Sequence, residues 1–436
     1  MIGITEGYVA TADHAFAGLD AHDLGADIGT TRSDVASTVA NSITFTVVRT
    51  SAEFEALAPE WNALFARCGK PHQIFQTFNW NWHWAQTFLD LKAREAAHSP
   101  MAILTGRRDG RLVTLWPMVV ERRGALTQLA WMGEPVSQYG DVLLDQSLAD
   151  PLAALQAGWT HIVATLKPDL ARLRKVRADA AVAPLLDALG SLHTAELEAP
   201  YIDLSRAANF AAYEERFAAR ARRNRRRQMR RLEEAGTVTF KHLEEGPEAS
   251  SFATTSIDLK RQWLIDRGYV SPALADVRMA RFMTAVAAGK SHSTATRVSV
   301  LLSKDKAAAI QIGFTCKNTR VLHVIVYDRA FEKMAAGVLH LEEAIRHGFD
   351  EKLDHIDLLA PAAEYKLDWA DGRVAVVDHA IGLSAKGRAY SRIYLGYLRG
   401  RLKSGIERMP HRLRQILVAS HLHLAAKRVM SLCGFA

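Results

Sequence analysis

Short β-prone runs alternate with helical segments along this chain, and the alternation occurs twice. In the first half, two such runs within residues 103–119 flank the turn dipeptide Asp109-Gly110, which predicts a hairpin. A similar hairpin is predicted within residues 298–314, about two hundred residues later, with its turn at Lys304-Asp305. Since hairpins occur among helix–strand alternations, a mixed β-sheet with packed helices is favoured over a purely parallel sheet.

The two hairpins are followed by similar elements, which predicts two similar domains in tandem. A helix and a strand are expected at 151–165 and 173–176, and again at 334–349 and 355–359. The fold class is therefore mixed α/β (α+β), with a mixed sheet and packed helices in each domain. The expected parts are a flexible tail at 1–41, domains at 42–200 and 201–382 joined near 195–205, and a basic helical extension at 383–436.

Other elements follow from hydrophobic periodicity. Strands are expected at 43–48, 127–132 and 142–144, and helices at 51–67, 182–189, 210–235 and 252–267. Ser51 is the expected N-cap of the helix at 51–67. Trp80, Trp84 and Phe88 recur at helical spacing, which predicts a buried helix face rather than a ligand site.

Composition and motifs exclude several classes of protein. Three widely spaced cysteines favour neither a disulfide framework nor a Cys-rich metal site. No stretch reaches the roughly 18 apolar residues of a spanning helix, and no signal peptide is recognised, so a cytoplasmic protein is expected. No His-x-x-x-His pair lies beside a suitable acid, so no metal is predicted. Nucleophile-elbow and P-loop motifs are also missing.

Positive charge is concentrated in two patches. Residues 220–231 contain eight arginines, and residues 384–436 contain eleven Lys and Arg against Glu407 alone. No aromatic residue lies between Phe217 and Phe240 to stack bases, so no nucleic-acid partner is expected from this pattern. The first patch is either a solvated helix or a surface for a phosphorylated acceptor. The carboxyl-terminal patch suits peripheral contact with anionic lipid, which would make the protein membrane-peripheral.

The segment at 320–348 carries the clearest indication of a binding site. A β-prone run, Val321 to Tyr327, is followed by small residues at 335–337 and by a helix expected to open at Met334. The free N–H groups at a helix start can hold a pyrophosphate. The alternative is an ordinary strand-to-helix connection in which Gly337 only permits close packing, and the segment alone favours that alternative.

The sequence resembles the GNAT superfamily of acyl-CoA-dependent N-acyltransferases, and more closely its cellulose-biosynthesis CelD-like branch, which is related to the Fem peptidoglycan aminoacyl transferases. The resemblance covers roughly residues 42–382, and its motifs are Phe75-Gln76-Thr77-Phe78 before Trp80 and Trp84, Leu115-Trp116-Pro117-Met118, Ser137-Gln138-Tyr139-Gly140-Asp141, Arg231-Leu232, Tyr327-Asp328, Ile356-Asp357-Leu358 and Glu364-Tyr365-Lys366. In the superfamily the pyrophosphate of coenzyme A lies on a Gln/Arg-x-x-Gly-x-Gly/Ala turn. The matching positions here are Glu332, Ala335 and Gly337, of which Gly337 fits the motif.

The resemblance implies roles for individual residues. Tyr365 and Lys366, expected at the end of a strand, would stabilise an oxyanion or orient substrate, and Asp357 and Glu364 are the candidate bases. The expected coenzyme A contacts are the backbone of Val324, Val326, Ala335, Ala336, Gly337 and Val338. The expected acceptor contacts are Gln138, Tyr139, Asp141, Arg223 and Arg227.

The expected function is transfer of an acyl group, acetyl in the first instance, from coenzyme A to an amine on a small molecule or glycan precursor of a surface polysaccharide. Two alternatives stay open. One is a non-catalytic accessory protein of polysaccharide synthesis, which the residues at Glu332 and Ala335 support. The other is a Fem-like transferase that takes its acyl group from aminoacyl-tRNA.

Overall fold

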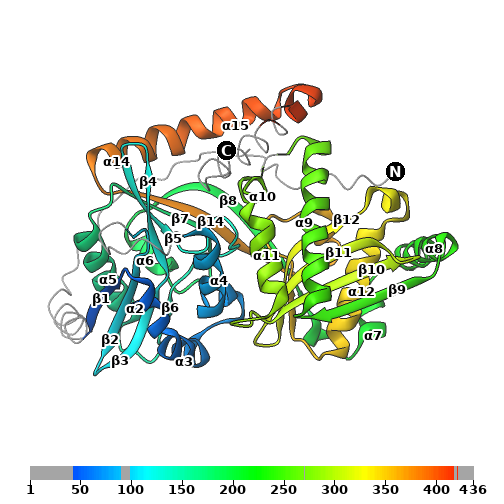
Figure 1. The fold of residues 1–436 in the computed structure, drawn as a ribbon, viewed down its shortest axis with the longest axis horizontal. Coiled ribbons are helices and arrows are strands. Elements are labelled where there is room, and N and C mark those ends of the chain that lie inside the picture. The colour runs from blue at the N-terminus through cyan, green and yellow to red at the C-terminus, as the bar shows by residue number, and fades with distance from the viewer. Residues whose placement is uncertain (1–42, 90–98, 270, 417–419, 421–436) are drawn as a thin grey trace, which may run out of the picture.

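The computed structural model describes residues 43–89, 99–269, 271–416 and 420, and the expected tail at 1–41 lies outside them. Figure 1 shows two sheet-containing halves side by side, with a helical segment crossing above them. A sheet of ten strands runs through both halves in the order β4-β5-β7-β14-β8-β13-β12-β11-β10-β9, and a smaller sheet has the order β1-β2-β3-β6. The mixed strand directions and the packed helices confirm the expected mixed α/β class.

The first half contains the smaller sheet and four strands of the long one. Its strands are β1 (Thr44–Val48), β2 (Ile103–Arg108), β3 (Arg111–Trp116), β4 (Met118–Arg123), β5 (Leu126–Trp131), β6 (Leu143–Leu144), β7 (Leu170–Arg177) and β8 (Leu192–Asp203). Its helices are α2 (Ser51–Ala56), α3 (Ala58–Cys68), the 3₁₀ helix η1 (Pro71–Gln76), α4 (Phe78–Phe88), α5 (Pro151–Leu166) and α6 (Ala183–Ala188).

The second half carries the remaining strands and most of the longer helices. Its strands are β9 (Val238–Glu244), β10 (Thr296–Ser303), β11 (Lys306–Cys316), β12 (Thr319–Tyr327), β13 (His355–Asp357) and β14 (Gly372–Gly382). Its helices are η3 (Leu204–Arg206), α7 (Phe210–Glu214), α8 (Ala219–Ala235), α9 (Pro247–Arg267), α10 (Pro272–Ala275), α11 (Arg278–Ala288), η4 (Arg329–Met334), α12 (Ala336–Asp350), α13 (Glu364–Leu367), α14 (Ala385–Ala389), the π-helix η5 (Tyr390–Leu398) and α15 (Arg399–Glu407).

Two of the predicted helices are each divided into two in the structure. The helix expected at 51–67 is two helices, α2 and α3, which meet at Leu57 ahead of Pro59. Its N-cap is Thr50 rather than Ser51: the Thr50 hydroxyl accepts from the backbone N–H of Glu53, whose carboxylate reaches back to Thr50. The helix expected at 210–235 is likewise divided into α7 and α8.

The expected core face of α4 is confirmed. Trp80 and Trp84 are buried, and Phe88 packs against the same core while stacking on Trp84 at a 5.8 Å ring separation. The Trp80 ring also meets Phe282 of α11 and Phe314 of β11, edge to face. One aromatic cluster therefore joins the first half to the second.

Helices cover both faces of β9–β12. Buried residues of α9 and α11, such as Ile257 and Phe282, pack on one face with Val300. Leu232 of α8 and Leu339 of α12 pack on the other face with Leu301. Because neighbouring strand residues point to opposite faces, Val300 and Leu301 belong to different core clusters.

Strand β14 lies far along the chain from the strands it joins. It pairs antiparallel with β7 on one side and with β8 on the other. The junction expected near 195–205 falls largely in β8, which is an interior strand of the long sheet. The sheet is continuous across this position, and the domain limits stay a prediction.

Two neighbouring strands diverge near the middle of the sheet. β12 pairs parallel with β13 only from Thr319↔His355 to Val321↔Asp357. Beyond Val321, β12 continues to Tyr327 along β11, while the chain after Asp357 turns away. This divergence leaves an opening between the two strands, with backbone polar groups of β12 along one edge.

Candidate active site

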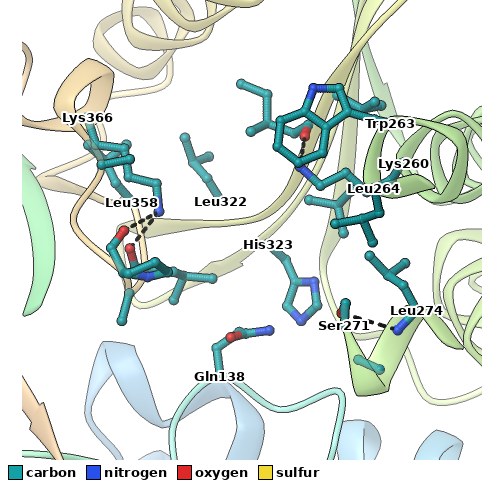
Figure 2. A pocket seen from close by; sticks show the side chains of 18 of the residues that line it. Gln138, Lys260, Trp263, Leu264, Ser271, Leu274, Leu322, His323, Leu358 and Lys366 are labelled. Atoms are coloured by element: carbon teal, nitrogen blue, oxygen red, sulfur yellow. Dashed lines mark hydrogen bonds between the residues drawn. The ribbon is translucent and has the colours of Figure 1, made fainter. Parts of the chain in front are cut away.

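A cavity of about 270 Å³ occupies the opening between β12 and the chain after β13. Its walls come from residues 322–327 of β12, the loop at 358–361, α9, α10 and the start of α12. Pro135, Gln138, Arg174 and Lys175 of the first half close the remaining side. Figure 2 shows Lys366 and Lys260 entering from opposite sides, with His323 and Gln138 between them.

Lys366 is the most strongly perturbed ionisable group in this cavity. Its ammonium donates to the carbonyl oxygens of Leu359 at 2.8 Å and Pro361 at 2.9 Å. Burial, together with the charge of Lys260, lowers the pKa of Lys366 to about 7, although Asp357 acts in the opposite direction. Lys366 therefore exchanges a proton near neutral pH, which suits a group that donates a hydrogen bond or a proton to a reacting atom.

Two further lysines face the same space. Burial is the main reason that the pKa of Lys260 and that of Lys175 are each lowered to about 8, and Arg267 and Arg174 respectively add to it. The Lys260 ammonium donates to the Ile325 carbonyl at 3.2 Å and lies 4.4 Å from the centre of the Trp263 ring. Three lysines among mainly apolar walls give the cavity a preference for anionic ligands with apolar parts.

The expected coenzyme A contacts fall partly on this cavity. Val324, Val326, Gly337 and Val338 line it, whereas Ala335 and Ala336 are not among its lining residues. The helix does not open at Met334, because η4 runs to Met334 and Ala335 follows in the left-handed region with φ 56°. A Cβ at Gly337 would lie 3.2 Å from the Tyr327 ring, so a larger residue there would crowd both the ring and the cavity.

Comparisons with known proteins relate part of the chain to a known family. Residues 219–367, which span α8 to α13, match the family model described as an acetyltransferase (GNAT) domain. Over these residues the chain is similar to a GNAT acyltransferase domain. Lys366, Gly337 and β12 all lie inside the matched range, so the cavity belongs largely to this domain.

Solved structures also align with more than three quarters of the chain. The FemX crystal structure is 10% identical, has a TM-score of 0.54, and aligns over 77% of this chain and 98% of its own. A tandem GNAT protein from the clavulanic acid biosynthesis pathway is 12% identical over 78% of this chain and 99% of its own, with a TM-score of 0.44. A conserved protein of unknown function from Bacteroides thetaiotaomicron is 10% identical over 77% and 99%, with a TM-score of 0.48. No curated protein matches the sequence.

These findings bear out the acyltransferase expectation and the fold class. The FemX likeness extends well beyond the GNAT domain, so the first half belongs to the same fold. Nothing in the comparisons singles out the CelD-like branch of the superfamily. Among the described residues, no helix is both long and apolar enough to cross a bilayer.

Tyr365 and Lys366 lie in a different local structure from the one expected. They belong to the one-turn helix α13, which follows the loop after β13, rather than to a strand end. Both residues line the cavity of the GNAT domain. Burial raises the pKa of Tyr365 to about 12, so its phenol stays protonated at neutral pH and its hydroxyl can donate a hydrogen bond.

The two candidate acids lie elsewhere. Asp357 is buried, accepts from the Tyr139 hydroxyl at 2.9 Å and the Leu359 amide at 2.8 Å, and pairs with Arg177 at 3.0 Å. Burial raises the pKa of Asp357, and Arg177 counteracts that shift. Glu364 is exposed, and neither acid lines the cavity. This placement favours a structural role for Asp357.

The expected acceptor residues are not gathered at one place. Gln138 lines the cavity and accepts from the Lys175 ammonium at 2.8 Å. Tyr139 and Asp141 are buried beneath it, and Asp141 accepts from Gln73 and from the amides of Val142, Ala181 and Val182. Arg223 and Arg227 are exposed on α8 and do not line the cavity.

Among the polar residues of the cavity, sequence reasoning missed Lys260, Lys175, His323, Arg174 and Ser271. His323 is the one polar side chain within the apolar run of β12, and that interruption could have marked it. Its Nε2 lies 2.8 Å from the Val136 carbonyl oxygen, and burial lowers its pKa to about 4, so the ring is neutral. Lys260 and Lys175 could not be recognised in this way, because a charged residue in the sequence of α9 or β7 is usually expected at the surface.

Proposed function

We propose that the cavity catalyses transfer of an acyl group from coenzyme A to an amine, with Lys366 as the central polar group. The amine nitrogen would form a bond to the thioester carbonyl carbon, the C–S bond would break, and the thiolate would leave with the proton that the amine gives up. The observation that carries this proposal is a lysine of lowered pKa inside the cavity of a GNAT domain.

Lys366 would act on the carbonyl oxygen as negative charge develops there. Its ammonium is oriented by the Leu359 and Pro361 carbonyls, so little rearrangement is needed when a third acceptor arrives. The Tyr365 hydroxyl is a second donor from the same helix turn. Neither Asp357 nor Glu364 lines the cavity, and the base stays a prediction that mutation must test.

The start of α12 suits the pyrophosphate of coenzyme A. The amides of Ala336 and Gly337 begin the helix, where N–H groups lack helical partners and the helix dipole is positive. Gly337 faces the cavity without a side chain, and the unpaired edge of β12, including Val324 and Val326, lies beside it. The lysines at 175 and 260 add positive charge for the donor's phosphates.

Calorimetric titration with acetyl-coenzyme A tests the donor. We expect binding in the wild type and at least a tenfold loss in Gly337→Leu, because its side chain would enter the cavity beside Tyr327. Gly405→Leu is the control, since no atom lies within 4 Å of a Cβ at that exposed helix position. Absence of binding to the wild type would sink the acyl-coenzyme A proposal.

The proposal also names an acceptor, a second candidate donor and a non-catalytic alternative. An amine on a polysaccharide or cell-envelope precursor is the acceptor we propose, because the apolar and cationic walls suit an anionic, partly apolar precursor. The FemX-like fold and the exposed Arg223 and Arg227 support aminoacyl-tRNA as the second candidate donor. Binding of acetyl-coenzyme A without turnover of any amine would favour the accessory protein.

We also propose that the carboxyl-terminal helices bind the surface of an anionic membrane. The large apolar side chains exposed there are Ile393, Tyr397, Leu398, Leu402, Met409, Leu413 and Ile416. Arg392, Arg401, Arg408 and Arg412 are exposed in the same segment. Apolar side chains among cations are typical of interfacial helices, and this contact would bring the enzyme to a lipid-linked acceptor.

A further inference from the structure

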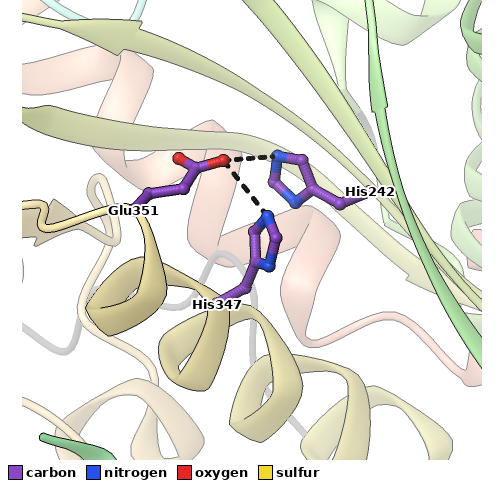
Figure 3. A group of neighbouring side chains, drawn as sticks. All are labelled: His242, His347 and Glu351. Atoms are coloured by element: carbon purple, nitrogen blue, oxygen red, sulfur yellow. Dashed lines mark ion pairs between the residues drawn. The ribbon is translucent and has the colours of Figure 1, made fainter.

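Two histidines and a glutamate from distant parts of the sequence meet at the outer end of α12. His242 comes from β9, the last strand of the long sheet, whereas His347 and the helix C-cap Glu351 are four residues apart on α12. Figure 3 shows both imidazoles turned toward the same carboxylate. Glu351 Oε1 lies 3.1 Å from His347 Nε2 and 3.5 Å from His242 Nε2.

The two distances from Glu351 are compatible with a metal coordination sphere. The candidate ligand atoms all lie within 4.8 Å of one another. Ligands about 2.1 Å from a tetrahedral zinc ion stand about 3.4 Å apart, close to both Glu351 distances. The residues at 347 and 351 are one helical turn apart, which places both side chains on the same face of α12. We propose that His242, His347 and Glu351 bind a divalent transition-metal ion of the zinc type.

The three donor groups determine which metals suit the site. Two imidazoles and one carboxylate favour Zn²⁺, Co²⁺ or Ni²⁺ over Ca²⁺ and Mg²⁺, which prefer oxygen ligands. The half-exposed His347 and Glu351 leave room for water as a further ligand.

Arg320 competes with the metal and also orients one ligand. Its guanidinium donates to Glu351 Oε2, to Thr315 Oγ1 at 2.7 Å and to His242 Nε2 at 3.2 Å. The first bond fixes the carboxylate so that Oε1 faces the imidazoles, as an outer-shell partner does in metal sites. The last bond must be given up on metal binding, and Arg297 nearby adds positive charge. We therefore expect micromolar rather than nanomolar affinity.

The site is separate from the acyl-transfer cavity. Gly337 and Val338 line that cavity at the start of α12, and Glu351 caps the other end of the helix. From the rise per residue of an α-helix, the two ends are about 20 Å apart. A metal there would tie α12 to the last strand of the sheet. Its effect would be on the position and stability of α12 rather than on the reacting atoms.

Titration of the chelator-treated full chain with Co²⁺ and Zn²⁺ tests this proposal. We expect one equivalent of Co²⁺ to produce visible absorption bands, displacement of those bands by Zn²⁺, and a melting temperature raised by Zn²⁺. His347→Ala and Glu351→Gln should each weaken binding at least about tenfold. His355→Ala is the control, because His355 also lies on a strand near a carboxylate, 3.7 Å from Asp203, but has no second histidine ligand.

Circular dichroism of each variant without metal shows whether it is folded, and Glu351→Gln preserves the shape of the side chain if His347→Ala fails to fold. Absence of cobalt bands in the wild type would reduce the cluster to a hydrogen-bond network and overturn the proposal. Binding that persists in both ligand variants, or that falls equally in His355→Ala, would overturn it as well.

Discussion

At the scale of single residues, Lys366 carries the proposed chemistry, and its charge should be visible in the kinetics. Lys366→Met removes the donor to the carbonyl oxygen and should lower kcat about 100- to 1000-fold. In the wild type, kcat should fall as pH rises through about 7, because the ammonium is lost there. Lys366→Arg keeps its charge, so its residual activity should lack this fall. A profile shared by wild type and Lys366→Arg would contradict the assignment.

The same lysine should make stability depend on pH. The unfolded chain holds the Lys366 proton up to its ordinary pKa of 10.5, whereas the folded protein releases it near 7. Between these values the unfolded state binds more protons, so rising pH increases the free energy of unfolding. Lys366→Met should remove this contribution, and its stability relative to the wild type should be higher at pH 6.5 than at pH 9. Urea unfolding of both proteins at the two pH values measures the difference.

Mutation of Asp357 distinguishes a structural role of its carboxylate from a catalytic one. Its carboxylate is buried with Arg177 and Tyr139. Asp357→Asn removes one of the two carboxylates that pair with Arg177, the other being Asp179, and should destabilise the fold by about 2 kcal/mol. Tyr139→Phe, which removes one hydrogen bond to the Asp357 carboxylate, should cost about 1 kcal/mol. Denaturant unfolding gives both values. A folded Asp357→Asn protein of unchanged stability and abolished turnover would instead support the base.

At the scale of elements, the left-handed residue before α12 gives a local test. Ala335 has φ 56°, a region that costs an L-residue about 1 kcal/mol and glycine very little. Ala335→Gly should therefore stabilise the protein by up to about that amount and keep acetyl-coenzyme A binding. Ala336→Gly, one position on and inside the helix, should destabilise it by about 0.5–1 kcal/mol. Thermal melts compare the pair, and equal shifts in both variants would contradict the conformational argument.

Local patterns predicted strands that are continuous apolar runs and missed two strands that charges interrupt. The hairpin around Lys304-Asp305 was predictable, because its strands are continuous β-prone runs. In the structure both turn residues adopt positive φ. β8 and β14 were not predicted, since charges such as Glu196, Glu198 and Asp378 interrupt them. The turn of α13 that carries Lys366 was also missed, because four residues give no helical period.

At the scale of the whole molecule, the site depends on contacts that no local pattern contains. The cavity is closed by Gln138 and Lys175, more than 180 residues before Lys366 in the chain. The resemblance to a known superfamily pointed to Lys366, Tyr365 and Gly337, which lie in motifs and line the cavity. Arg223 and Arg227 were expected to contact the acceptor only because they are charged. In the structure both are exposed on α8. The side chains that complete the cavity become neighbours only when β14 joins β7 and β8.

The exposed carboxyl-terminal helices give the last prediction. Figure 1 shows α15 and the segment before it along one side of the molecule, above both halves. The Arg401 guanidinium lies over the Tyr397 ring at 4.3 Å, so cationic and apolar groups share this surface. Vesicles containing phosphatidylglycerol should bind the protein, and vesicles of phosphatidylcholine alone should not. Each Lys or Arg near an anionic surface contributes about 1 kcal/mol, so added salt should release the protein.

Flotation of the protein with these vesicles distinguishes the two basic patches. Leu402→Glu with Leu413→Glu should abolish flotation, because both side chains are exposed and apolar. Arg223→Glu with Arg227→Glu, which changes more charge on α8, should leave it intact if the carboxyl-terminal helices are the contact. Loss of flotation in the α8 pair alone would instead assign the membrane contact to the GNAT domain. In that case α8, which packs against α12, would face the membrane.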